Sequence, residues 1–313
     1  MEEYFDNKSI FLLINKWRLQ ILIITVITAI VSGLATYLVT PLYKSTAVLY
    51  PVNLATFSDE NETEQMLQFL QSNDIKFKLI ENLKLDKHYQ IDKNDKLFNS
   101  YMFHELRKKI ILNKTEYESV RIIVFDKDPN MAVNIINEII KLYNKKVQAI
   151  HKYKYKELLD IKAKEMRNKS NEIDSLEKRI NYLRNEYGLL DYKNQVKELT
   201  RNYFRLSSTK SDKAQEAKIL LDNFEKYGGE YKALDLTILN EIENLNVLKQ
   251  EYEKVSSEYH KDITYANIIE EPFAADEISK PIRWVIILLS VVGVLILFII
   301  VMAIVENIKT QKK

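Results

Sequence analysis

Uncharged hydrophobic residues form two long runs in this sequence. Residues 19–39 read LQILIITVITAIVSGLATYLV, and residues 284–305 read WVIILLSVVGVLILFIIVMAIV. A helix of about 21 residues is roughly 32 Å long, and the hydrocarbon core of a bilayer is about 30 Å thick. Neither run has the polar face of a helix in a soluble protein. The pattern therefore predicts two transmembrane helices, at residues 19–40 and 283–305.

The first run is predicted to be an uncleaved membrane anchor. The hydrophobic part of a secretory signal has about 7–15 residues and ends at small residues. Here the run is longer and continues into TPLYKS, which does not resemble a cleavage site.

Basic residues near the two runs predict the orientation of the chain. Lys8, Lys16 and Arg18 precede the first run and only Lys44 follows it closely, while Lys309, Lys312 and Lys313 follow the second and Lys280 and Arg283 precede it. Loops on the cytoplasmic side carry the excess of lysine and arginine. We therefore expect tails 1–18 and 306–313 in the cytoplasm and the residues between the spans on the opposite side.

The segment 41–128 shows both strand and helix patterns. Alternation with β-branched and aromatic residues predicts strands at 42–51, 107–113 and 118–126. Apolar residues at helical spacing predict two helices between 62 and 83, separated and capped at Asn73 and Asp74. A last strand is expected at 263–271, pairing near the first. We therefore expect an α+β membrane protein whose α+β region lies close to the bilayer.

Residues 129–262 are predicted to form a long antiparallel helical hairpin with short cap helices. Asp128 can cap the first helix, and Pro129 suits its first position. Two apolar seams recur at steps of three or four residues: Ile173, Leu176, Ile180, Leu183, Tyr187 and Leu190, then Tyr231, Leu234, Ile238, Ile242, Leu245, Leu248, Tyr252, Val255 and Tyr259. The YGG at 227–229 is taken as a helix stop. A compact helical bundle is the alternative, but its helices are usually shorter.

Composition gives no support for catalysis or for nucleic-acid binding. The net charge is +2, with 29% charged residues, no cysteine and five glycines. The histidines at 88, 104, 151 and 260 lack metal-ligand spacing and are expected at the surface, and no phosphate-binding loop is present. The basic residues 107–109 are a weak candidate for anion binding, but the edge of a strand also explains them. We expect no enzyme activity, no cofactor and no metal.

The order of short motifs resembles the polysaccharide co-polymerases, the Wzz-like chain-length determinants of O-antigen and related surface polysaccharides. Similar segments are PLYKSTAVLYP, LQSNDIKFKLIENLKL, SVRIIVFDKDPNMAVNIINEIIKLY, NEYGLLDYKNQ and EPFAADEISKPIRWVIILL. Each motif is short, so the order carries the similarity, which covers nearly the whole chain. The resemblance implies a bacterial inner-membrane protein with a periplasmic main domain that regulates polymer length without making a bond itself.

The resemblance also implies partners and a functional segment. A homo-oligomeric ring in the lipid bilayer is expected, together with the membrane polymerase and, as a further candidate partner, the growing polysaccharide. The membrane-proximal segment 263–282 contributes Pro272, Ser279 and Pro281, followed by Arg283. Pro281 keeps the preceding residue out of a helix, and Lys280 and Arg283 are expected to reach phosphate headgroups.

The last span departs from the family pattern because Gly293 has no second glycine four residues later. Ala29 and Gly33 in the first span supply a small-residue face instead.

Several alternatives remain open. A capsule or exopolysaccharide export component would share this architecture. A sensor, a membrane-fusion adaptor and an enzyme with an outer catalytic domain fit less well, and the residues after Val305 are too few for the tyrosine kinase that related chains carry.

Overall fold

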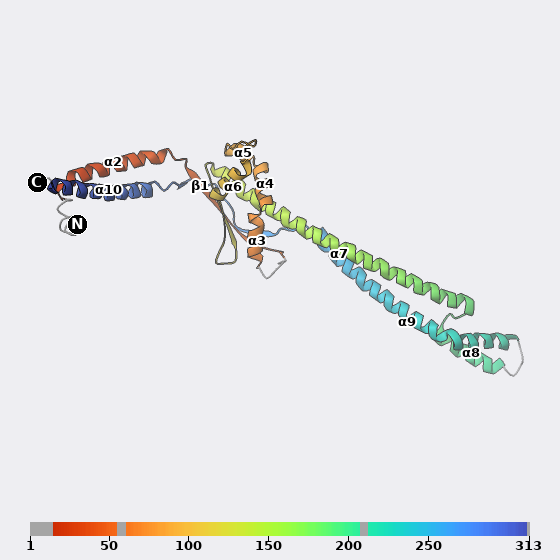
Figure 1. Ribbon diagram of the computed structural model, residues 1–313. Coiled ribbons are helices and arrows are strands. Elements are labelled where there is room, and N and C mark those ends of the chain that lie inside the picture. The colour runs from red at the N-terminus through yellow and green to blue at the C-terminus, as the bar shows by residue number, and fades with distance from the viewer. Residues whose placement is uncertain (1–14, 55–60, 207–211, 312–313) are drawn as a thin grey trace. The chain divides into compact units, whose positions relative to one another are not determined.

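A computed structural model describes residues 15–54, 61–206 and 212–311. The chain forms two compact units (Figure 1). The base unit contains Met1–Lys146 and Thr264–Lys313, and the hairpin unit contains Val147–Ile263. Lys8, Lys312 and Lys313, which contribute to the predicted orientation, lie outside the described residues.

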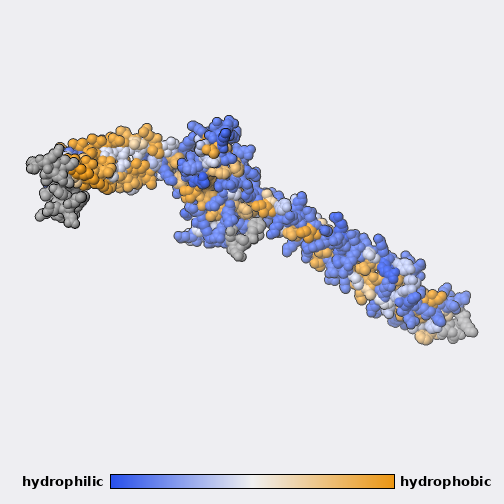
Figure 2. All heavy atoms as spheres, viewed as in Figure 1, coloured by the Kyte–Doolittle hydropathy of each residue, from blue (hydrophilic) through white to orange (hydrophobic). Residues whose placement is uncertain are grey.

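Two hydrophobic helices of the base unit correspond to the predicted spans. Helix α2, Arg18–Tyr37, and helix α10, Arg283–Gln311, lie side by side (Figure 1). Only 6% of the hydrophobic window in each helix is buried, whereas the core helix of a soluble protein is mostly buried. Figure 2 shows that the visible face of both helices is mostly hydrophobic. Length and composition therefore identify both as candidate membrane spans.

An antiparallel sheet forms the centre of the base unit. Its strands are β1 (Leu42–Pro51), β2 (Ile110–Lys114), β3 (Val120–Asp126), β4 (Ala266–Glu270) and β5 (Ile278–Lys280). They are arranged in the order β2-β3-β1-β4, and β5 also pairs with β1. Every second residue of β3 from Val120 is buried, as the two-residue period of a half-covered strand requires. The predicted strands at 42–51, 118–126 and 263–271 are confirmed.

Between β1 and β2, the described residues form four helices of the base unit. They are α3 (Glu62–Gln71), α4 (Asn73–Asn82), α5 (Leu85–His88) and α6 (Phe98–Lys109). The first two confirm the predicted pair, but the break falls at Ser72, and Asn73 and Asp74 belong to the first turn of α4. The sequence pattern did not predict α5 and α6.

The predicted strand at 107–113 is wrong in its first part. Residues 107–109 form the last turn of α6, and β2 begins at Ile110. Cations are favoured at a helix C-terminus by the helix dipole, which explains the basic run better than a strand edge does. Lys109 also reaches Glu105, one turn earlier, with an Nζ–Oε1 distance of 3.3 Å.

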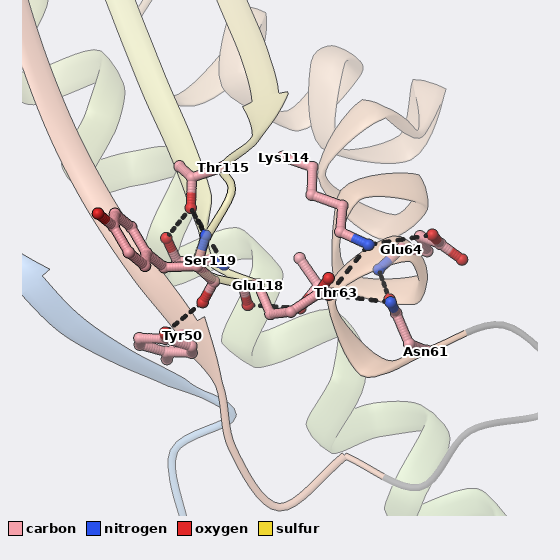
Figure 3. A network of polar contacts seen from close by, with 9 residues as sticks. Tyr50, Asn61, Thr63, Glu64, Lys114, Thr115, Glu118 and Ser119 are labelled. Carbon is pink, nitrogen blue, oxygen red and sulfur yellow. Dashed lines mark hydrogen bonds and ion pairs between the residues drawn. The ribbon is translucent and has the colours of Figure 1, made fainter.

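Hydrogen bonds and an ion pair connect the turn between β2 and β3 to the start of α3 (Figure 3). Glu118 is central to them: its backbone carbonyl accepts from Thr63 Oγ1 at 2.6 Å, and its carboxylate accepts from Asn61 Nδ2 at 2.9 Å. Lys114 pairs with both Glu64 and Glu118. Asn61 also caps α3, because its side chain accepts from the Glu64 N–H. The network fixes the helix start against the sheet.

The hairpin is confirmed by its ion pairs. Helix α7 runs unbroken over Pro129–Tyr187, and α9 returns over Asp212–His260. The Asn130 N–H donates to Asp128 Oδ1 at 2.9 Å, which confirms the predicted cap. Along the hairpin the ion pairs Lys162–Glu251, Lys169–Glu241 and Arg179–Glu230 show partner numbers that fall as residue numbers rise. The two helices are therefore antiparallel.

The apolar seams form the core of the hairpin unit, with one shift. Ile180, Leu183, Leu189, Phe224, Tyr231 and Ile238 make a buried cluster. Leu190, predicted in the first seam, is 67% exposed, whereas Leu189 is fully buried. The reason is that α7 ends at Tyr187 and Gly188 has a φ of +70°, so the helical period stops there.

The YGG sequence is not a helix stop, and this prediction is wrong. Helix α9 begins at Asp212 and continues through both glycines to His260, and the short helix between α7 and α9 in the described residues is α8, Tyr192–Leu206. A Cβ at Gly228 would lie 2.6 Å from Cε2 of Tyr192. Gly228 therefore allows α8 to approach α9 closely.

The two adjacent glycines should respond oppositely to alanine. Gly229→Ala should stabilise the hairpin by about 1 kcal/mol, because alanine favours a helix and nothing lies within 4 Å of the new Cβ. Gly228→Ala should lose that gain and be destabilising by about 1 kcal/mol or more, because the Tyr192 ring must move. Thermal unfolding of the two variants, followed by circular dichroism, measures the difference. Equal stabilisation by both would contradict the close packing of α8.

Candidate functional site

Both candidate spans connect to the same end of the sheet. Strand β1 follows α2, and β5 precedes α10. These two strands pair, with Leu42 opposite Lys280 and Tyr43 opposite Ile278. Tyr43 is also opposite Asp126 at the end of β3. We call this region, residues 37–45, 125–126 and 272–283, the junction.

Two cations at the junction lie over aromatic rings. The Arg283 guanidinium is 4.1 Å from the centre of the Tyr37 ring, and Lys280 Nζ is 4.0 Å from the centre of the Phe125 ring. The first contact joins α10 to α2, and the second joins β5 to β3. Cation–π contacts of this kind are worth about 0.5–1 kcal/mol at exposed sites. The expected contact with phosphate headgroups thus has competing partners within the chain.

The junction contains most of the segment singled out by sequence. Ser279 lies in β5, Pro281 lies between β5 and α10, and Pro272 precedes the strand; all three are half-buried. Lys280 is in a strand, as expected for a residue before proline. The carbonyl of Phe273 accepts from the buried Ser45 hydroxyl at 2.9 Å, which holds this segment against β1.

The small residues of the two spans differ in whether they contact the neighbouring span. A Cβ at Gly33 would lie 3.8 Å from Cδ1 of Ile287, so Gly33 is on the side of α2 that contacts α10. Ala29, one turn earlier, is half-buried, and Thr36 is buried on the same side. Nothing described lies within 4 Å of a Cβ at Gly293. The small-residue face of α2 therefore contacts α10, whereas Gly293 does not pack within the described chain.

A buried carboxylate lies at the centre of a polar cluster beside the junction. Asp126 is fully buried at the end of β3. Its Oδ1 lies 2.7 Å from His88 Nε2 and accepts from the Asp128 N–H at 3.0 Å, and its Oδ2 accepts from the Tyr89 hydroxyl at 2.8 Å. Lys109 Nζ is 4.0 Å from Oδ2 and 3.9 Å from the centre of the Tyr89 ring. We call Asp126, His88, Tyr89 and Lys109 the Asp126 cluster.

The sequence analysis missed this cluster and misplaced His88. Its side chain is 14% exposed and pairs with Asp126, so the expectation of a surface histidine is wrong for this residue. His104 and His260 are exposed as expected, and His151 is half-buried. The strand period was an available signal, because it places Asp126 on the same buried face as Ile122 and Val124.

The contacts of the Asp126 cluster hold several elements of the base unit together. The Asp126 carboxylate accepts from donors on both oxygens, and a buried charge is stable only when it is paired in this way. Among the described residues, no group of three His, Cys, Asp or Glu side chains could hold a metal ion. The cluster thus connects α5, α6 and the end of β3, next to the strands that continue into the spans.

Burial raises the pKa of two tyrosine hydroxyls in the base unit. The pKa of Tyr89 is raised by burial first and then by the adjacent Asp126 carboxylate. The pKa of Tyr143 is raised by burial, with a smaller contribution from Glu62. A folded-state pKa above the unfolded value contributes stability that is present below the unfolded pKa and is lost as pH rises.

The base unit should therefore lose stability in alkali. Above about pH 10, unfolded tyrosines ionise while Tyr89 and Tyr143 stay protonated in the folded state, so each should cost about 1.4 kcal/mol per pH unit. Tyr143→Phe should reduce this slope, measured by urea unfolding between about pH 9 and 11. Tyr117→Phe, at a side chain that is 79% exposed, is the control and should leave the slope unchanged. An unchanged slope in Tyr143→Phe would contradict the assignment.

Comparison with solved structures gives similarities of low sequence identity. A full-length bacterial polysaccharide co-polymerase is 13% identical, with 98% of this chain and 99% of that chain covered and a TM-score of 0.48. The Shigella flexneri lipopolysaccharide O-antigen chain-length regulator WzzBSF is 14% identical, with 76% and 100% covered and a TM-score of 0.33. A fragment of WzzB, a polysaccharide co-polymerase from Salmonella Typhimurium, is 11% identical, with 77% and 100% covered and a TM-score of 0.29.

No family model matches the chain, and no curated protein matches it.

Proposed function

We propose that this protein regulates the chain length of a lipid-linked surface polysaccharide of the O-antigen type. It would act without catalysing a reaction, as a co-polymerase beside the membrane polymerase. The observation that carries the proposal is an antiparallel hairpin of 59-residue and 49-residue helices placed, in sequence, between two candidate spans. A long, regular helical surface of this kind suits a protein that organises other molecules.

The proposal includes a topology. Both termini are in the cytoplasm, α2 and α10 cross the inner membrane, and the sheet and hairpin are in the periplasm. A single cysteine tests this topology cleanly, because the chain has none. Glu116→Cys, in the turn between β2 and β3, should react with a membrane-impermeant maleimide in spheroplasts. Reaction only after lysis would contradict the proposed orientation.

The proposal also includes a homo-oligomeric ring. Leu236, Leu239 and Ile242 recur every three residues on α9 and are 53%, 58% and 39% exposed. Single exposed apolar residues are common, but a row of them along one helix is typical of a protein–protein surface. Mass photometry of the full chain in nanodiscs measures the number of copies, and a stable monomer would exclude the ring.

We assign the junction the role of relaying changes between the spans and the periplasmic region. Pro272, Ser279, Pro281 and Arg283 are the residues proposed for this role, because they lie where α10 meets the strand paired with β1. The small-residue face at Ala29 and Gly33 keeps α2 against α10, and Gly293 is available for a contact outside the chain.

Deletion of the gene tests the function directly. The polysaccharide ladder on a gel should lose its modal length and regain it when the wild-type chain is restored. Arg283→Gln should restore it only partly if the junction relays between the spans and the sheet, whereas Arg205→Gln, at the end of α8, should restore it fully. A ladder of normal length with polymer retained in the periplasm would instead favour the export component.

A further inference from the structure

The base unit contains an apolar cavity that the proposed function does not use. Its volume is about 330 Å³, and it lies between α3, α4, α6, β2 and α7. The inner wall consists of aliphatic side chains that are each at most 3% exposed: Leu70, Ile75, Leu79, Leu106 and Ile139. Ile110 and Leu112, on the edge strand β2, complete the wall.

The cavity is partly open to solvent, because the exposed residues Gln71 and Arg107 belong to its lining. An apolar cavity of about 150 Å³ is known to bind benzene, so about twice that volume can hold a hydrocarbon chain of roughly eight to twelve carbons. The cavity also falls within the common size range of small-molecule sites.

Three polar residues line the cavity, and two of them carry positive charge. They are Gln71, Lys76 and Arg107, and no carboxylate belongs to the lining. Arg107 is exposed and has no ion pair among the described residues. Lys76 Nζ is 3.3 Å from Asn73 Oδ1 and 5.7 Å from the centre of the Phe103 ring, so its charge is not neutralised by these contacts. An apolar interior with two cations is complementary to an anionic amphiphile.

The helix dipole of α6 also explains the position of Arg107, without any bound ligand. Arg107 lies in the last turn of α6, where any cation interacts favourably with the helix dipole. Lys108 occupies the same turn and is exposed, but it does not line the cavity. It is therefore a matched control.

We propose that this cavity binds a single hydrocarbon chain that carries an anionic phosphate or carboxylate headgroup. The chain lies among the aliphatic side chains, and Arg107 and Lys76 hold the headgroup. Binding of this ligand does not depend on the proposed regulation of polysaccharide length.

A single-cysteine protection experiment tests the site in the full chain. Gln71→Cys places a thiol in the lining of the cavity, and Lys108→Cys places one in the last turn of α6, outside the cavity. In nanodiscs of neutral phospholipid, octyl phosphate and octanoate should slow maleimide labelling at Gln71→Cys by roughly ten-fold and leave Lys108→Cys unchanged. Inorganic phosphate should protect neither. Equal protection at both positions, or none at Gln71→Cys, would overturn the proposal.

Variants separate the contributions of headgroup and chain. In the Gln71→Cys background, Arg107→Gln should raise the half-protecting concentration of octyl phosphate by roughly five-fold, as expected for loss of a charge-assisted contact, and Lys108→Gln should not. The neutral octyl glucoside should protect much less than octyl phosphate. Equal protection by both amphiphiles would refute the anionic headgroup.

Filling the cavity tests the hydrocarbon chain. Leu112→Trp, at a half-buried position of β2, should abolish protection while circular dichroism shows a folded protein. Leu112→Phe is the milder second variant if the tryptophan impairs folding. Unchanged protection in a folded filled variant would place the amphiphile elsewhere and refute the site.

The lipid composition of the nanodiscs distinguishes a membrane lipid from a free amphiphile as the ligand. Protection in anionic phosphatidylglycerol nanodiscs without added amphiphile, but not in neutral ones, would identify the ligand as a membrane phospholipid with one of its two acyl chains in the cavity. Protection only by added amphiphile would identify a free one. Protection that rises with protein concentration alone would show that another copy of the chain covers the cavity, which contradicts the proposal.

Discussion

Replacing Asp126 by alanine should destabilise the base unit by about 3–5 kcal/mol. The change removes the acceptor for Tyr89 and the Asp128 N–H, and it leaves His88 and Lys109 without their shared carboxylate. Unpaired buried donors lose their hydrogen bonds without regaining water. The melting temperature, followed by circular dichroism, should fall by roughly 10 °C.

An exposed aspartate provides the control for this effect. Asp276, which precedes β5, is exposed, and Asp276→Ala should change stability by less than about 0.5 kcal/mol. Hydrogen exchange in Asp126→Ala should increase in β3, α5 and α6. A melting temperature within a degree or two of the wild type would show that the cluster contributes little to the base unit.

Leu183→Ala should be the most damaging conservative change in the hairpin unit. Leu183 is fully buried in the cluster with Ile180, Phe224 and Tyr231. Truncation leaves a cavity between α7 and α9 and should cost about 2–5 kcal/mol. Hydrogen exchange should rise in α8 and in the parts of α7 and α9 that contact it.

Ile219 is the control, because it is an aliphatic residue on α9 that is 56% exposed. Ile219→Ala should shift hairpin stability by less than about 0.5 kcal/mol. If both variants exchanged equally fast, the assigned core would be wrong. Comparing each variant with the control in its own unit shows whether the loss of stability comes from removing the buried side chain of Asp126 or Leu183.

The sequence pattern predicted the elements in which hydrophobic residues recur at a regular period or form an unbroken run. The two uncharged runs, the alternation of β1 and β3 and the cap at Asp128 and Pro129 each depend on residues close in sequence. The antiparallel hairpin also followed from its seams, because two long apolar stripes can be covered by packing on each other. The predicted seam failed only at Leu190, where the left-handed Gly188 changes the direction of the chain.

Features that depend on a partner distant in sequence were not predicted. The sequence pattern predicts a helix stop at Gly228, because it does not show that Tyr192 packs closely against this residue. His88 looked like a surface residue because its partner, Asp126, is thirty-eight positions away. Arg107 was assigned to a strand, although the helix end and the cavity beside it explain its position better.

The sequence by itself determined that this chain has two candidate spans, an α+β region and a long helical hairpin, because hydrophobic period and length act locally. The tertiary structure determined which strands connect to the spans, that the Asp126 side chain is buried, and that an apolar cavity lies between α3, α4, α6, β2 and α7. Those outcomes depend on contacts between segments far apart in the chain. Local propensity carries no information about such contacts until the elements pack.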